Sequence, residues 1–459
     1  MKKEKEMTIP RIMITAVSSG SGKTLLTCGL LRALKVRKKK VAAFKCGPDY
    51  IDPMFHKKIL QIPSRNLDTF FTDSFTTKYL FTNAAKDSDV AVIEGVMGYY
   101  DGVGGISEQG SSYELAKTLD TPVILVVNAK GMSLSIVPVI KGFLEFRSNS
   151  NIKGVILNQV SEMFYPELKK VIEKELSIEV LGYVPKVEEL VLESRHLGLV
   201  MPDEVHKIEE KIDELAKRLE KTLSIDRILE IANLAQEMIQ SQYECQTLSS
   251  APLIAIARDE AFCFCYEDNL ELMEKMGANL TFFSPIHDKK LPDNIQGLIL
   301  YGGYPELYAK QLSENDSMLC EIRDYVKSKR PILAECGGFM YLHDTMEDNA
   351  NHSYDMVGAI NGNVYKTKRL GRFGYIELKP NKKDTLLALD EMIKGHEFHY
   401  FESENCGSDF NAKKPLRNTA WDCIHATSNQ NVGFPHLYYY SNPSFIYRFL
   451  SRCNNNRSV

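Results

Sequence analysis

Residues 12–24, IMITAVSSGSGKT, form an apolar run that ends in a loop of glycine and serine followed by Lys23 and Thr24. A strand that stops in such a loop and continues into a helix is typical of a phosphate-binding loop, whose backbone amides turn inward around phosphates. Lys23 then bridges the terminal phosphates, and the Thr24 hydroxyl holds Mg²⁺. The strict pattern has glycine where this chain has Val17. The alternative is an ordinary turn before a helix, but Gly-Lys-Thr after a strand favours the phosphate loop.

Acidic residues follow other apolar runs in the same half of the chain. Glu94 comes directly after the run 90–93, and Asp49 and Asp52 follow the run 41–45. Carboxylates at the ends of strands beside a phosphate loop are candidates for Mg²⁺ coordination or for positioning water. An Asp in a glycine-rich turn, such as Asp101, is more often a capping residue. Several acids at strand ends beside one phosphate loop nevertheless favour a functional role for these carboxylates over a capping role.

A second reactive loop lies in PILAECGG, residues 331–338, where a short apolar run ends at Cys336. A cysteine alone is usually a small buried apolar residue. Here the two following glycines allow a tight turn from strand to helix that projects the thiol, and we expect the helix N-terminus to stabilise a thiolate. Cys336 is therefore predicted to be a covalent nucleophile.

Two further segments supply what a thiol nucleophile needs. Gly302 and Gly303 follow the apolar run 297–300, and their amides are candidates for an oxyanion hole. His436, near the C-terminus, is the candidate base that activates the thiol. A lone histidine is more often structural, but this order of glycines, cysteine and late histidine is specific.

Apolar runs alternate with helical patterns in both halves of the chain, which predicts mostly parallel sheets with helices on both faces. A charged helical stretch after residue 203 separates the two halves, and 459 residues exceed what one hydrophobic core usually supports. We therefore expect two α/β domains. The predicted boundaries are 8–225 for the ATP-dependent domain, 226–250 for a helical linker, 251–447 for the thiol-dependent domain and 448–459 for a tail.

Composition excludes several classes of protein. A formal net charge of −4 gives no electrostatic reason to expect nucleic acid or an anionic membrane as a partner. The charged start lacks the apolar core of a secretory signal, and no apolar stretch approaches the roughly 20 residues that span a bilayer. The 10 cysteines show no spacing typical of zinc sites or disulfides. We expect a cytoplasmic protein, and a homodimer is compatible with the sequence.

These segments resemble those of the cobyrinate a,c-diamide synthase family, whose members are ATP-dependent amidotransferases of corrinoid biosynthesis. The resemblance covers nearly the whole chain and is carried by residues 18–24, 45–53, 93–102, 154–160, 193–199, 300–306, 335–338, 395–400 and 435–443. It implies two doubly wound α/β domains. The first is similar to dethiobiotin synthetase and the second to class I glutamine amidotransferases. Class I enzymes carry a Glu two residues after the histidine, and this chain has Tyr438 there. The family shares this loss of the Glu. The resemblance therefore implies a Cys–His dyad.

The implied activity is amidation of the a and c carboxylates of cobyrinate with ammonia from glutamine, through acyl phosphates formed from ATP and Mg²⁺. The residues that we assign to this activity fall into five groups. They are Cys336 and His436 for glutamine hydrolysis; Gly302 and Gly303 for the oxyanion hole; Gly20, Gly22, Lys23, Thr24 and Asn158 for ATP; Thr24, Asp49, Glu94 and Asp101 for the metal; and Lys45, Arg195, Arg369, Arg372, His396 and His399 for the substrate.

Three alternatives remain at this point. The same reaction on hydrogenobyrinate or nickel-sirohydrochlorin is open, because the chain does not reveal the metal of the macrocycle. Cobyric acid synthase matches residues 18–24 and 45–53 less well. A partitioning ATPase with a phosphate loop leaves Cys336, the glycine pair and His436 without a role.

Overall fold

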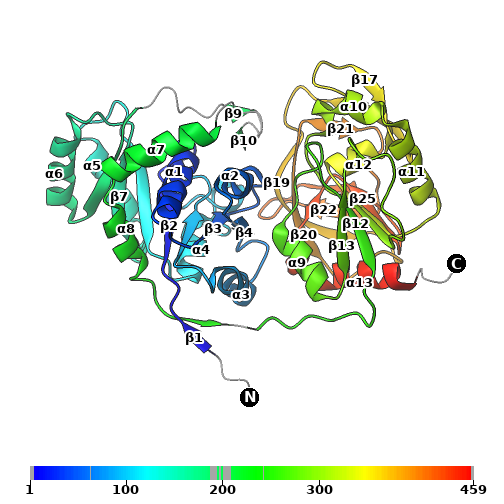
Figure 1. Ribbon diagram of the computed structural model, residues 1–459, viewed down its shortest axis with the longest axis horizontal. Helices are drawn as coiled ribbons and strands as arrows, with labels where there is room; N and C mark the ends of the chain where they lie inside the picture. The colour runs from blue at the N-terminus through cyan, green and yellow to red at the C-terminus, as the bar shows by residue number, and fades with distance from the viewer. Residues whose placement is uncertain are drawn as a thin grey trace. The chain divides into compact units, whose positions relative to one another are not determined.

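The computed structural model describes residues 5–62, 64–186, 194–195, 198–199, 208–240 and 242–455. The chain divides between Tyr243 and Glu244 into two compact units, each with its own sheets and core (Figure 1). Within the described residues, no helix combines the length and apolar character needed to cross a membrane.

The first unit is built on a parallel sheet, in which seven described strands follow the order β4-β3-β5-β2-β6-β7-β8. Helices lie on both faces of this sheet (Figure 1). Both faces of the inner strands are therefore buried, which explains why they read as continuous apolar runs. The strands are β2 Arg11–Ala16, β3 Val41–Cys46, β4 Ser64–Leu67, β5 Val90–Glu94, β6 Val123–Asn128, β7 Ile152–Asn158 and β8 Glu179–Val184.

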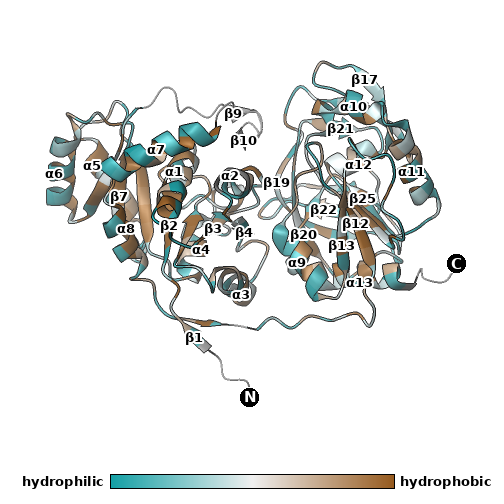
Figure 2. Ribbon diagram, viewed as in Figure 1, coloured by the Kyte–Doolittle hydropathy of each residue, from teal (hydrophilic) through white to brown (hydrophobic). Residues whose placement is uncertain are grey.

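The helices of this unit pack their apolar sides on the sheet and on one another. Figure 2 shows α7 largely in the hydrophilic colour and the sheet mainly in the hydrophobic colour. The helices are α1 Lys23–Val36, α2 Ile51–Leu60, α3 Ser74–Ala85, α4 Ser112–Thr118, α5 Ile136–Glu145, α6 Tyr165–Leu176, α7 Ile208–Thr222 and α8 Ile225–Ala232. Gly29 lets α1 and α7 approach closely, since a Cβ there would stand 2.7 Å from Leu219 and 2.8 Å from Leu215.

The first unit extends further along the chain than the predicted boundary at residue 225. Helix α8 packs into this unit, with Ile228 fully buried and Ser224 N donating to Leu181 O at 2.8 Å. Strand β11, Met238–Gln240, pairs with β1, Lys5–Met7, in an antiparallel ribbon. Much of the segment predicted as a linker, 226–250, is therefore part of the first unit.

The second unit combines a mainly parallel sheet with a mixed sheet, in which β16 and β18 pair in parallel, and an antiparallel sheet. In the part of the chain that the structure describes, the sheet orders are β13-β12-β14-β15-β25-β24, β17-β16-β18-β21 and β23-β22-β19-β20-β26. The strands of the first sheet are β12 Leu253–Ala257, β13 Asn279–Phe283, β14 Gly297–Leu300, β15 Ile332–Glu335, β24 His425–Ala426 and β25 Gln430–Gly433. The others are β16 His343–Glu347, β17 Ser353–Asp355, β18 Ile360–Lys366, β19 Arg372–Pro380, β20 Ile393–His399, β21 Phe401–Ser403, β22 Phe410–Lys413, β23 Ala420–Cys423 and β26 His436–Leu437.

The helices of the second unit run to the end of the described chain. They are α9 Glu267–Lys275, α10 Ala309–Ser313, α11 Asp316–Lys327, α12 Gly337–Tyr341 and α13 Pro443–Asn455. Phe449, Leu450 and Cys453 of α13 are fully buried. The prediction of a tail from residue 448 is wrong for residues 448–455, because the apolar side of α13 belongs to the core.

We expect Leu215→Ala to destabilise the first unit by about 3 kcal/mol, because Leu215 is fully buried between α7 and α1 and its removal leaves a cavity. Urea unfolding of the full chain, followed by circular dichroism, measures this change. The neighbouring Glu214→Ala is the control, since the Glu214 side chain is 52% exposed and its surface pair with Arg218 contributes little. Equal midpoints for the two variants would contradict the packing described.

Candidate active sites

The phosphate loop between β2 and α1 is held open by positive φ angles. Gly20 has φ 73° and Gly22 has φ 88°, a region that favours glycine, and Gly22 is the residue from which α1 starts. Asn158, at the end of β7, donates from Nδ2 to Ser21 O at 2.8 Å. A Cβ on Gly22 would stand 2.3 Å from that same Nδ2. Asn158 therefore supports the loop from behind.

Lys23 is 7% exposed and donates to two backbone carbonyls, Ser18 O at 3.2 Å and Met97 O at 2.5 Å. Burial lowers the pKa of Lys23 to about 8, and nearby Lys45 acts in the same direction. The turn that carries Met97 is fixed by Asp101, whose Oδ2 accepts from Gly98 N at 2.9 Å. In this structure Asp101 thus acts on the phosphate lysine through the backbone.

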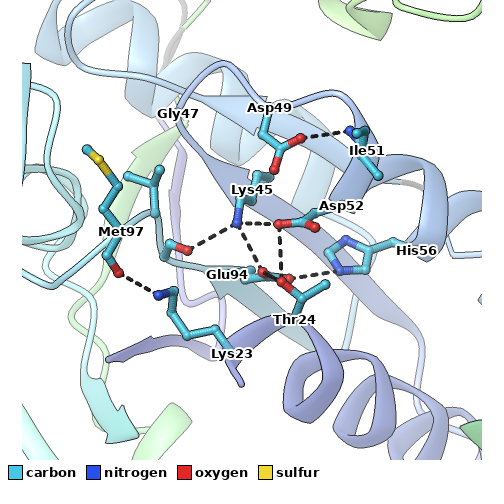
Figure 3. A network of polar contacts seen from close by, with 12 residues as sticks. Lys23, Thr24, Lys45, Gly47, Asp49, Ile51, Asp52, His56, Glu94 and Met97 are labelled. Carbon is cyan, nitrogen blue, oxygen red and sulfur yellow. Dashed lines mark hydrogen bonds and ion pairs between the residues drawn. The ribbon is translucent and has the colours of Figure 1, made fainter. Parts of the chain in front are cut away.

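A buried polar network lies below the loop, with Glu94 at its centre (Figure 3). Glu94 is fully buried at the end of β5, and its Oε1 accepts from Thr24 Oγ1 at 2.7 Å and from Lys45 Nζ at 3.0 Å. Lys45 Nζ also lies 2.5 Å from Asp52 Oδ2, and Thr24 Oγ1 lies 3.3 Å from that same oxygen. One lysine and one hydroxyl therefore share two carboxylate oxygens.

Strand register and helical spacing produce this arrangement. Lys45 and Glu94 are direct partners across β3 and β5. Asp52 and His56 stand four residues apart on α2, so they lie on one face of that helix. His56 Nε2 lies 3.3 Å from Glu94 Oε2, and His56 Nδ1 lies 3.0 Å from Ser64 Oγ. Glu94 is thus held on both of its oxygens.

The charged groups of this network shift one another's pKa values. Burial raises the pKa of Glu94, but Lys45 and then His56 outweigh it and hold that pKa below its usual range. For Asp52, burial together with Asp49 and Glu94 raises the pKa above the ordinary value. Burial lowers the pKa of Lys45, yet Asp52 and Glu94 outweigh this and hold it high. Lys45 is therefore a stable ammonium.

The donor set of this network fits Mg²⁺. Thr24 Oγ1 is 2.7 Å from Glu94 Oε1 and 3.3 Å from Asp52 Oδ2, and adjacent ligands of an octahedral Mg²⁺ are about 3 Å apart. Among the described residues, no group of three or more His, Cys, Asp or Glu could hold a metal ion. A metal here would need further oxygens, such as those of nucleotide phosphates.

The structure places two of the predicted residues differently. Asp49 accepts a hydrogen bond at 2.8 Å from the N–H of Ile51, the first residue of α2. Lys45, expected as a substrate contact, is only 4% exposed and is engaged by both carboxylates. Asp52 takes the place beside Glu94. In the sequence, Asp52 could have been identified from its position in the same segment as Lys45 and Asp49.

The second site is built on a strained turn. Cys336 has φ 46° and ψ −106°, a conformation rare for a residue with a side chain, between β15 and α12. Its N donates to Gly433 O at 2.9 Å. The turn is close-packed, since a Cβ on Gly338 would stand 2.1 Å from Leu300 O. This is the geometry of a nucleophile elbow.

His436 reaches this elbow because the chain changes sheets. Strand β25 pairs with β15 up to Gly433, and β26 then begins at His436 and pairs with β20. The His436 ring stacks on His396, with centroids 4.9 Å apart. Gly302 lies against the same ring, since a Cβ there would stand 2.3 Å from His436 Cε1. Gly303 N lies 3.1 Å from the place of a Cβ on Gly337, the residue after the nucleophile.

The protonation states of Cys336 and His436 differ from the prediction, which was a thiolate at Cys336. Burial raises the pKa of the Cys336 thiol, and Glu306 and Glu397 raise it further. Burial likewise lowers the pKa of His436 well below its usual value, with His396 and His399 acting in the same direction. Helix α12 has only 5 residues, too short for its dipole to overcome burial. At rest the Cys336 thiol and the His436 imidazole are therefore both neutral.

A carboxylate that sequence reasoning missed lies beside the pair. Glu335 Oε2 is 4.0 Å from His436 Nδ1, and Glu335 Oε1 accepts from Tyr439 Oη at 3.4 Å. Burial raises the pKa of Glu335 to about 8. The position that carries the acid in class I enzymes, Tyr438, instead donates to Asp268 Oδ2 at 3.3 Å. Glu335 directly precedes the nucleophile, which was the available signal.

The remaining predicted residues are of three kinds. His396 and His399 are buried, and His399 Nε2 lies 3.1 Å from Glu397 Oε2, so both form the frame around His436. Arg372 lies over the Trp421 ring at 5.2 Å, and Arg369 is exposed. The side chain of Arg195 lies outside the described part of the chain.

Two domain models match the two units. The CobQ/CobB/MinD/ParA nucleotide binding domain matches residues 12–200, and the CobB/CobQ-like glutamine amidotransferase domain matches residues 253–422. The chain is 41% identical to "Cobyrinate a,c-diamide synthase" of Caldanaerobacter subterraneus, over 96% of this chain and 98% of that protein. The chain belongs to the cobyrinate a,c-diamide synthase family.

Other proteins of this name are similarly close. The chain is 40% identical to the one from Clostridium acetobutylicum, over 95% of this chain and 98% of that protein. It is 38% identical to the one from Salmonella typhimurium, over 96% of this chain and 97% of that protein. Membership in the cobyrinate a,c-diamide synthase family confirms the resemblance seen in the sequence, and the expected fold class of two α/β domains is confirmed as well.

Gly302→Ala is expected to lower glutamine hydrolysis roughly 10²-fold, because the added methyl group displaces the His436 ring. Initial rates of glutamate release measure this loss. Gly142→Ala is the matched control, since nothing lies within 4 Å of the added Cβ. Equal glutaminase rates for the two variants would show that the Gly302 contact does not position His436.

Proposed function

We propose that this chain is an ATP-dependent, glutamine-hydrolysing ligase that amidates the a and c side-chain carboxylates of cobyrinate. The observation that carries this proposal is the full-length similarity, at 41% identity, to a protein named for that reaction. The two sites give the chemistry that such a reaction needs. A phosphate loop lies over a buried acid pair, and the loop of Gly302 and Gly303 lies against both the strained cysteine turn and the neutral histidine.

Ammonia is released at the cysteine site. Cys336 Sγ attacks the side-chain carbonyl carbon of glutamine, and His436 accepts the thiol proton. His436 then gives this proton to the leaving nitrogen, which departs as ammonia and leaves a thioester on Cys336. Water hydrolyses the thioester to glutamate. Gly303 N, close to Gly337, is placed to stabilise the oxyanion of both steps.

The carboxylate is activated at the phosphate loop. A free carboxylate is a poor electrophile, so one of its oxygens attacks the γ-phosphorus of ATP and ADP leaves. Ammonia then attacks the acyl carbon, loses a proton and expels phosphate, so that an amide remains. The pKa of Lys23 is lowered by burial to about 8, and nearby phosphates favour its ammonium form, which then stabilises the transferring group.

The residues that would hold Mg²⁺ are Thr24, Asp52 and Glu94, with Asp49 close enough to shift the pKa of Asp52. When bound, this ion supplies charge stabilisation for phosphoryl transfer. Arg369 and Arg372 are the described cations proposed to face substrate carboxylates.

The direct test is mass spectrometry of the product formed from cobyrinate, ATP and glutamine labelled with ¹⁵N in its side-chain amide. We expect two amide groups, both carrying ¹⁵N. Hydrogenobyrinate and nickel-sirohydrochlorin, assayed in parallel, discriminate between the three macrocycles. Absence of any ATP-dependent amide from all three would overturn the proposal.

Cys336→Ala is expected to abolish synthesis from glutamine and to retain synthesis from ammonium salts, because the thiol is needed only to release ammonia. Lys23→Ala is expected to lose synthesis with either nitrogen source, because carboxylate activation precedes amidation. Product quantification with each donor separates the two sites. If Lys23→Ala kept full activity with ammonium, the acyl phosphate scheme would fail.

The sequence holds a single phosphate loop and a single predicted nucleophile, so one site forms both amides, either by rebinding of the substrate in a rotated pose or by a pivot within one cleft. We expect monoamide to accumulate before diamide in a time course, because rebinding requires the substrate to leave and return in a second orientation. Quenched samples separated by chromatography measure both species. Diamide from the first turnover, with no free monoamide at any time, would contradict release between the two steps.

A further inference from the structure

Lys45 Nζ lies against the two carboxylate oxygens of the buried network that would be ligands of a metal ion. The Nζ atom lies 2.5 Å from Asp52 Oδ2 and 3.0 Å from Glu94 Oε1, and it donates to Gly95 O at 3.2 Å. These two carboxylate oxygens are also the ones that Thr24 Oγ1 contacts. Lys45 and Mg²⁺ would therefore compete for the same oxygens (Figure 3).

The position of Lys45 is built into the fold. The register of β3 and β5 places Lys45 opposite Glu94, and α2 brings Asp52 over both. Lys45, Asp52 and Glu94 are 4%, 5% and 0% exposed. Solvent screens these charges little, so a divalent ion cannot join the same oxygens without strong repulsion from the ammonium.

Nucleotide phosphates change this balance. Mg²⁺ is usually bound by one or two carboxylates together with substrate phosphates and water. Two carboxylates and a hydroxyl are too few donors to displace a buried ammonium, whereas phosphate oxygens add both ligands and negative charge. The phosphates also give Lys45 an alternative partner.

We propose that Lys45 is an internal counter-ion that holds the metal position in the nucleotide-free protein, so that Mg²⁺ binds only together with nucleotide. This inference rests on the proposed use of ATP and Mg²⁺ at the phosphate loop. Lys45 is thereby a positioning residue for the acid pair: it holds Asp52 and Glu94 close together until the metal arrives.

The test measures metal binding directly, with Mn²⁺ as the probe and electron paramagnetic resonance of free Mn²⁺ as the readout. Nucleotide-free wild type is expected to bind Mn²⁺ weakly, and a non-hydrolysable ATP analogue is expected to tighten binding. Lys45→Met without nucleotide is expected to bind Mn²⁺ roughly ten-fold more tightly than wild type, since the competing ammonium is gone.

Two further variants locate the effect. Lys40→Met removes the same charge from an exposed residue just before β3, and it is expected to bind like wild type. In Lys45→Met/Glu94→Gln the gained affinity is expected to disappear, because one of the two carboxylates is neutral. Equal Mn²⁺ affinity in Lys45→Met and wild type would overturn the proposal, as would tight binding of one Mn²⁺ by nucleotide-free wild type.

The wild-type titration remains decisive if Lys45→Met does not fold. It also separates this inference from the proposed function. A protein that forms diamide but binds Mn²⁺ tightly without nucleotide contradicts only the counter-ion role. A protein that forms no ATP-dependent amide but shows the expected Mn²⁺ pattern contradicts the proposed reaction and leaves the role of Lys45 standing.

Discussion

The pairing of β3 with β5 sets the charge balance on which the ATP site depends. It places Lys45 opposite Glu94 at the edge where the phosphate loop leaves β2. Glu94 then accepts from Thr24 and Lys45 on one oxygen and lies beside His56 on the other. A shift of one residue in this register would turn Glu94 to the other face of the sheet and leave Lys45 buried without its partner.

A comparable constraint governs the glutamine site, where two sheets meet. The elbow at Cys336 ends a strand of the parallel sheet, while His436 begins a strand of an antiparallel one. Glycine at position 302 is needed because the imidazole occupies the space of a side chain. Burial keeps the thiol and the imidazole neutral. In the proposed reaction, proton transfer therefore accompanies the attack on glutamine and need not precede it.

The sequence predicted the parts of the fold that depend on local patterns. Strands β2, β3, β5 and β12 are continuous apolar runs, and both reactive loops carry glycines that mark their turns. The strands β16–β23 were not predicted, since many of their residues are polar or exposed and do not form apolar runs. The end of the chain was predicted to be a tail because its asparagines are typical of disordered ends. The apolar residues of α13, which are buried, precede them.

Some site residues could likewise be predicted from local sequence patterns, whereas the roles of others depend on tertiary packing. Lys23, Glu94, Cys336 and His436 stand in recognisable segments. The structure places Lys23, Glu94 and Cys336 at the expected loop or strand end, and His436 at the start of β26. The roles of Asp52, His56 and Glu335 depend on how α2 and β26 pack, which no local pattern gives. The neutral state of Cys336 likewise depends on burial, which outweighs the short helix behind it.

The central claim is that the acid network and phosphate loop activate a carboxylate by phosphoryl transfer. Its most direct test uses a macrocyclic substrate labelled with ¹⁸O in its side-chain carboxylates, incubated with ATP and glutamine. Mass spectrometry of the released phosphate is predicted to show one ¹⁸O transferred for each amide formed, because the carboxylate oxygen leaves with the phosphoryl group. Unlabelled phosphate, or label recovered in AMP, would contradict the claim.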